Sequence, residues 1–101
     1  MEFQIGELYF MVWYPDEAKR YIVPDSIVFA GTNLLADDIG PDTWYFQDSD
    51  SYCAHGLYKA GAEPTAANVR LYRLKTEDLY QVVDSKGLAD ELARCAERRS
   101  R

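Results

Sequence analysis

Residues 8–14 read Leu8-Tyr9-Phe10-Met11-Val12-Trp13-Tyr14, and this run decides the fold of the chain. It holds only β-branched, aromatic and long apolar side chains, and Pro15-Asp16 ends it. Seven residues is the length of a strand, and apolar side chains at both odd and even positions indicate that both faces are at least partly covered. The sequence therefore predicts a strand that is packed on both sides.

A second strand follows after a short loop. Residues 15–20 are mostly polar and are typical of a hairpin connection. Residues 21–23 resume a β pattern, Pro24 interrupts it, and residues 26–30 continue it. Because proline cannot donate a ladder hydrogen bond, Pro24 is expected at a sheet edge or at a strand start. Two antiparallel strands joined by a short loop are the simplest interpretation.

Further elements follow the same kinds of signal. Residues 43–47 predict a third strand, and residues 48–50 offer N-cap side chains for a short helix over residues 51–55. Residues 69–74 alternate and predict a fourth strand. Residues 79–83 are compatible with a fifth strand or a helical turn, and we favour the strand.

A final helix is predicted from about Lys86 to Arg98, with Leu88, Leu92 and Cys95 on one face. The 101 residues are one domain by length. The expected fold is α+β. It is an antiparallel sheet of four to five strands, with a C-terminal helix packed on one face and a short helical turn after the third strand.

The net charge of −6 is unevenly distributed along the chain. Residues 1–50 carry ten acids and two bases, a net −8, whereas residues 51–101 carry seven acids and nine bases, a net +2. An acidic surface repels nucleic acid and attracts basic partners. With no apolar run of about 20 residues and no signal-peptide pattern, a cytoplasmic protein that binds neither nucleic acid nor membrane is expected. Cys53 and Cys95 are expected to be reduced and largely buried, and the alternative is a disulfide between them if the protein is exported without a cleaved signal.

Catalytic and metal-binding patterns are weak. His55 is the one histidine in the chain and precedes Gly56, where an imidazole can satisfy helix-end carbonyls. The alternative is a metal site formed by Asp48, Asp50 and His55, but this spacing matches no standard signature. No nucleophile, phosphate-loop or dinucleotide motif occurs. We therefore expect a non-catalytic protein without a cofactor or a metal ion.

The better candidate for function is the acidic and aromatic segment over residues 37–50, which holds five acids and no base around Trp44-Tyr45-Phe46. Carboxylates pair with Arg and Lys, and exposed rings anchor interfaces. The alternative is that the rings face the core and the acids only solubilise the rim. The candidate partner-binding residues are Asp37, Asp38, Asp42, Trp44, Tyr45, Asp48 and Asp50.

Two short patches carry a resemblance. Residues 44–48 followed by Tyr52, and residues 82–84 followed by Gly87-Leu88, resemble small acidic bacterial immunity proteins of polymorphic and type VI toxin systems. The resemblance implies a cytoplasmic inhibitor that binds a cognate toxin and blocks its active site or substrate groove. It identifies no binding residues.

The sequence thus supports two functional hypotheses. The first is a non-catalytic inhibitory binding protein, an immunity protein whose acidic first half meets a basic surface on its partner. The second is a small structural or regulatory subunit that acts as a homodimer through an edge strand or the C-terminal helix. A third, an enzyme that depends on His55, predicts loss of activity in His55→Ala.

Overall fold

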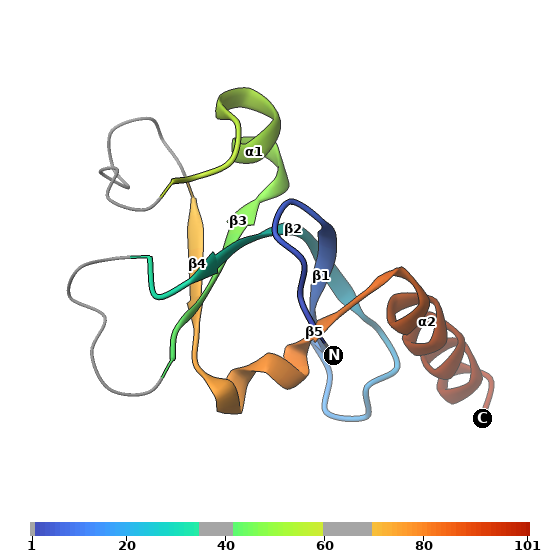
Figure 1. Ribbon diagram of the computed structural model, residues 1–101. Coiled ribbons are helices and arrows are strands. Elements are labelled where there is room, and N and C mark those ends of the chain that lie inside the picture. The colour runs from blue at the N-terminus through green and yellow to red at the C-terminus, as the bar shows by residue number, and fades with distance from the viewer. Residues whose placement is uncertain (1, 35–41, 60–69) are drawn as a thin grey trace.

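The computed structural model describes residues 2–34, 42–59 and 70–101. Over these residues the chain forms a five-stranded antiparallel sheet in the order β4-β3-β2-β1-β5 (Figure 1). Its strands are β1 (Leu8–Trp13), β2 (Val23–Thr32), β3 (Trp44–Asp48), β4 (Leu71–Leu74) and β5 (Val82–Val83). The helices are α1 (Ser49–His55), the 3-10 helix η1 (Thr76–Gln81) and α2 (Ser85–Arg99). The predicted α+β fold is confirmed.

The β1–β2 hairpin occupies the middle of the sheet, as the apolar run in β1 indicates. Leu8 pairs with Val28 at one end of the ladder, and Trp13 pairs with Val23 at the other. Strand β2 runs through Pro24, because β3 pairs with β2 only from Ile27 onward. Pro24 therefore stands near the start of β2, where β3 does not pair with it and the missing N–H costs no hydrogen bond to β3.

The segment between β4 and β5 differs from the prediction. A strand over residues 79–83 was expected, but residues 76–81 form η1 and only Val82 and Val83 extend the sheet. The strand order gives the reason: β4 and β5 lie at opposite edges, so the chain must cross the sheet between them (Figure 1). The helix η1 makes this crossing, and its Leu79 packs against the core.

The main core lies on one face of the sheet. Its rings pack edge to face: Phe3 meets Tyr9 with centroids 5.1 Å apart and Phe46 with centroids 5.2 Å apart. Such pairs add about 0.5–1.5 kcal/mol beyond their burial. The buried members of this core are Tyr9, Met11, Ile27, Phe29, Phe46 and Val82.

The two α-helices contact different parts of the sheet. Helix α1 contacts β2 and β3, whereas α2 contacts β1 and β5. On α2 the predicted apolar face is only partly covered, since Cys95 is fully buried but Leu92 is 46% exposed. Helix α2 is therefore anchored mainly near its C-terminal half. Among the described residues, no helix is long and apolar enough to cross a membrane.

Candidate functional site

The acidic residues of the predicted site are not brought together. Asp37 and Asp38 lie outside the described residues. Asp42 precedes β3, where its carboxylate accepts a hydrogen bond from Asn33 Nδ2 at 2.9 Å. Asp48 ends β3, six residues further on, and extended backbone over that length spans about 20 Å. This separation exceeds two Debye lengths at physiological salt, about 8 Å each, so Asp42 and Asp48 do not reinforce one field.

Asp48 and Asp50 belong to a local structural unit instead. Asp48 is the N-cap of α1, and its Oδ2 accepts hydrogen bonds from the backbone N–H groups of Asp50 and Ser51. The same oxygen lies 3.0 Å from the Arg70 guanidinium, which is also 3.9 Å from the Asp50 carboxylate. Arg70 therefore offsets the charge of Asp48 and part of that of Asp50, and the cap explains why an acid stands at residue 48.

The aromatic residues of the predicted site mostly face inward. Tyr45 is fully buried, and the Arg73 guanidinium lies 5.6 Å from the centre of its ring. Phe46 is fully buried in the main core, and Trp44 is half-buried and packs against that core. Of these rings only Trp44 keeps some surface for a partner. The partner-binding role of this segment stays a prediction, with Asp42, Trp44 and Asp50 as its accessible described members.

Large apolar side chains are exposed at a different place, the loop end of the β1–β2 hairpin. Trp13 is 54% exposed, Val23 is 47% exposed, and Tyr80 of η1 is 78% exposed. Trp13 and Val23 are cross-strand partners. We call these three residues the aromatic surface.

Two adjoining hollows connect the members of the aromatic surface. Trp13 and Tyr80 both line a groove of about 540 Å³, together with Asp16 and Lys19 of the hairpin loop. Trp13 and Val23 line a second hollow of about 350 Å³ beside it. Trp13, Tyr14 and Pro15 line both hollows, and of these three Trp13 is the large apolar side chain that is exposed.

The Trp13 ring is held in place although it is exposed. Its indole Nε1 donates a hydrogen bond to Asp25 Oδ2 at 2.9 Å. A fixed ring loses little conformational freedom when a partner covers it, which favours binding. Tryptophan and tyrosine are also the side chains that most often dominate interface energies.

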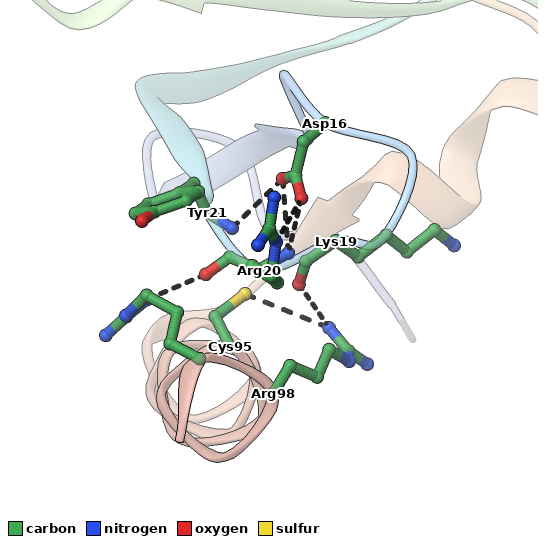
Figure 2. Close-up of polar contacts among 7 residues, drawn as sticks. Asp16, Lys19, Arg20, Tyr21, Cys95 and Arg98 are labelled. Atoms are coloured by element: carbon green, nitrogen blue, oxygen red, sulfur yellow. Dashed lines mark hydrogen bonds and ion pairs between the residues drawn. The ribbon is translucent and has the colours of Figure 1, made fainter. Parts of the chain in front are cut away.

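The hairpin loop beneath this surface is organised by Asp16. Its carboxylate accepts hydrogen bonds from the backbone N–H groups of Arg20, at 3.1 Å, and Tyr21, at 3.2 Å. It also accepts one from Arg20 Nε at 3.1 Å (Figure 2). Burial would raise the pKa of Asp16, but these hydrogen bonds outweigh it and hold that pKa below its ordinary value. The loop is therefore ordered by its own side chains.

Two arginine side chains of α2 donate hydrogen bonds to the backbone of the same loop. Arg98 Nη1 donates to the Lys19 carbonyl at 2.9 Å, and Arg99 Nη1 donates to the Arg20 carbonyl at 2.8 Å. Figure 2 shows Arg98 and Cys95 of the helix beneath the loop. Since the helix N-terminus begins next to β5, α2 links the far edge of the sheet to the hairpin loop.

A partly buried pair joins α2 to Tyr14, the residue that follows β1. The Tyr14 hydroxyl donates to the Glu91 carboxylate, which also accepts from Arg94. Burial, together with the adjacent carboxylate of Glu91, raises the pKa of Tyr14 to about 12. The hydrogen bond from Tyr14, followed by that from Arg94, lowers the pKa of Glu91 below its ordinary value of about 4.5. Folding therefore favours the protonated phenol and the ionised carboxylate.

This pair predicts a pH-dependent contribution to stability. Because the pKa of Glu91 is lowered in the folded state, its stabilisation is complete above about pH 4.5 and is lost as the pH falls through the lowered value. The stability difference between wild type and Glu91→Gln should therefore stay constant from about pH 7 to about pH 5 and shrink as the pH falls below about 4.5. Urea unfolding at each pH measures it. Glu97→Gln is the control, since the Glu97 side chain is 70% exposed. A difference that is independent of pH would contradict the assignment.

The residues considered for catalysis are dispersed. His55 is exposed at the end of α1, and the Gly56 N–H, not the imidazole, bonds to the Tyr52 carbonyl. Within the described ranges no three His, Cys, Asp or Glu side chains lie close enough to hold a metal ion. Both cysteines are free thiols; Cys95 is buried as expected, but Cys53 is exposed, contrary to the prediction. Cys53 stands on a short surface helix that buries only Ser51.

Sequence reasoning missed the aromatic surface. Trp13 shares the parity of the buried residues Tyr9 and Met11, so its pattern predicts a core position. The available signal was its place two residues before Pro15, at the very end of the apolar run. Comparison of the chain with protein-family models, with curated proteins and with solved structures gives no match.

Proposed function

We propose that the chain is a non-catalytic protein-binding module that contacts its partner through the aromatic surface. The observation that carries the proposal is Trp13, which is half exposed, hydrogen-bonded to Asp25 and part of the lining of two adjoining hollows. Exposed apolar surface is unfavourable in water, and exposed apolar side chains around a groove favour an interaction site. A partner that covers Trp13 and Tyr80 removes that surface from solvent.

The support around Trp13 favours binding with little rearrangement. Asp16 orders the loop from within, and Arg98 and Arg99 hold it from α2. A preformed surface avoids much of the entropy loss that flexible loops suffer on association. The aromatic surface is thus presented by β1 and β2, which an ordered loop joins, and by η1.

We further propose that this binding is inhibitory, as in a cytoplasmic immunity protein that neutralises a bacterial toxin. The support is the resemblance carried by residues 44–48 and 82–84. A basic partner was expected because the acidic residues were expected to form one surface. Among the described residues, Asp42 lies apart from Asp48, and Arg70 is paired with Asp48 and Asp50. The aromatic surface provides a contact that does not require that acidic patch.

Co-expression tests the proposed function directly. The product of the adjacent reading frame should arrest growth of a host cell, and the wild-type chain should restore it. The double variant Trp13→Ala, Tyr80→Ala should restore growth poorly, because both anchors are lost. Lys59→Ala, at an exposed residue after α1, is the control and should protect like wild type. Full protection by the double variant would refute the aromatic surface, and a harmless neighbouring product would refute the immunity role.

A homodimeric subunit is the alternative, and the position of β4 favours it. Strand β4 forms one edge of the sheet, and edge strands can pair with another chain. Sedimentation of the purified protein separates the two hypotheses. A tight dimer that forms without any other protein would support the subunit, whereas a monomer would leave the binding module as the better account.

A further inference from the structure

The hairpin loop and the end of α2 gather positive charge beside the aromatic surface, although the chain as a whole carries −6. Lys19 and Arg20 lie in the loop, and Arg98 and Arg99 lie in the last turn of α2 that contacts it. We call these four residues the cationic cluster. The loop also contains the acids Asp16 and Glu17, so four cations stand against two acids and leave a net +2.

The other cations near this end of α2 are already balanced. Arg94 pairs with Glu91, and Arg101 lies 3.7 Å from the carboxylate of Glu97. In the cluster itself only Arg20 has an acidic partner, Asp16 at 3.1 Å. Lys19, Arg98 and Arg99 have no ion pair within 4 Å with any described residue, although the charge of Arg98 also acts on Glu91. Lys19 and Arg99 in particular keep charge for an incoming group.

The guanidinium groups of the cluster are ordered before any partner arrives. Arg98 and Arg99 are fixed by their hydrogen bonds to loop carbonyls, at 2.9 and 2.8 Å. Arg20 and Arg99 both lie over the ring of Tyr21, 5.9 and 5.5 Å from its centre. A guanidinium has five N–H donors, and these contacts use only some of them. The remaining donors suit carboxylate oxygens, which arginine binds in a bidentate manner.

The cationic cluster is continuous with the groove of the aromatic surface. Lys19 lines the groove that Trp13 and Tyr80 also line, and Lys19 and Arg20 are adjacent in the loop. A peptide bound in this groove would place apolar side chains on Trp13 and Tyr80. The peptide residues that follow would then lie next to the cationic cluster.

We propose that the partner binds through an acidic peptide segment, with apolar side chains on the aromatic surface and carboxylates on the cationic cluster. This inference rests on the proposed function and names the chemistry of its partner. A peptide is favoured over nucleic acid because a phosphate backbone is charged at every residue and is repelled by a chain of net −6. An anionic membrane is disfavoured for the same reason. Its broad negative surface would act on the net negative charge of the whole protein and not on the cationic cluster alone.

Selection from a displayed library of random dodecapeptides on the wild-type protein tests the proposal. Enriched sequences should combine Asp or Glu with an aromatic or large aliphatic residue. Enrichment of basic or neutral sequences, or no enrichment, would overturn the proposal. A single-stranded oligothymidylate and vesicles containing phosphatidylserine are assayed in parallel, and tighter binding of either one than of the best peptide would also overturn it.

Affinity measurements with the best selected peptide then locate the contact. Arg98→Gln, Arg99→Gln should weaken binding by about tenfold or more, because two charge-assisted contacts are lost. Lys59→Gln, Lys86→Gln removes the same charge at two exposed residues outside the cluster and should bind like wild type. Equal affinity of the cluster variant and wild type contradicts the proposal.

A measurement on the wild-type protein alone guards against misfolding of the cluster variant. Raising the salt concentration from about 50 mM to about 500 mM should lower the affinity for the peptide by about tenfold. An affinity that does not depend on salt would contradict the electrostatic contact. Binding of the cognate partner also distinguishes the proposed function from the proposal of an acidic ligand. Dependence on Trp13 without dependence on Arg98 and Arg99 would leave the proposed function standing and remove this inference. Independence from Trp13 would remove the proposed function.

Discussion

Gln47→Leu should destabilise the protein by about 2–4 kcal/mol, more than any surface change. Gln47 is fully buried in β3, and its side-chain amide makes three hydrogen bonds. Its Nε2 donates to Ser51 Oγ at 3.1 Å and to the Gly56 carbonyl at 3.0 Å, and its Oε1 accepts from the Tyr58 N–H at 2.8 Å. Leucine has a similar volume but no polar atom. The substitution therefore leaves backbone groups without partners, at about 1–3 kcal/mol each.

The consequence extends beyond Gln47 itself. These three bonds tie α1 and the segment after it to the sheet, on the face opposite the Phe46 core. The amide hydrogen of Tyr58 should therefore exchange faster in Gln47→Leu than in wild type. Urea unfolding should show a lower midpoint with an unchanged slope.

Gln4→Leu is the matched control for this prediction. The Gln4 side chain is exposed, so the same substitution should change stability by less than about 0.5 kcal/mol. If Gln47→Leu also stayed within that range, the hydrogen-bond network would not contribute to the fold as described.

The neighbouring residues Phe46 and Gln47 illustrate what local patterns predict. A strand with aromatic residues was expected here, and alternation sends Phe46 to the core and Gln47 to the other face. The pattern does not reveal that a glutamine is fully buried, because its partners come from a helix and a loop that follow it. Burial of Gln47 depends on the tertiary position of α1.

Local signals near helix ends were informative. The Asp48-Ser49-Asp50 sequence predicted an N-cap, and Asp48 fills that role. The same signals did not reveal Arg70, whose guanidinium reaches Asp48 across 22 residues of sequence. Counting charges along the chain therefore overstated the acidic field of this segment, since the offsetting charge comes from the second half.

Trp13 is a residue whose exposure the sequence pattern did not predict. Its parity and its neighbours in β1 predict burial, but the sheet ends beside it and nothing among the described residues covers more than about half of the side chain. The exposure of a strand end is set by the elements packed over it. A pattern within one strand contains no information about them.

Trp13→Ala should weaken binding of the cognate partner by about 30-fold or more. A tryptophan at the centre of an interface typically contributes at least about 2 kcal/mol, which corresponds to that ratio at room temperature. The folded protein should lose little stability, because Trp13 is 54% exposed and outside the main core. Trp13→Phe keeps a ring but loses the hydrogen bond to Asp25, so its affinity should fall between those of Trp13→Ala and wild type.

The dissociation constant of the cognate partner, compared across three variants, tests the central claim most directly. Trp13→Ala should raise it by about 30-fold. Leu92→Ala, at a side chain 46% exposed on α2, and the double variant Asp42→Lys, Asp50→Lys should each change it by less than about threefold. The opposite pattern, with Trp13→Ala binding like wild type and the lysine variant losing affinity, would return the contact to the acidic segment and contradict the account.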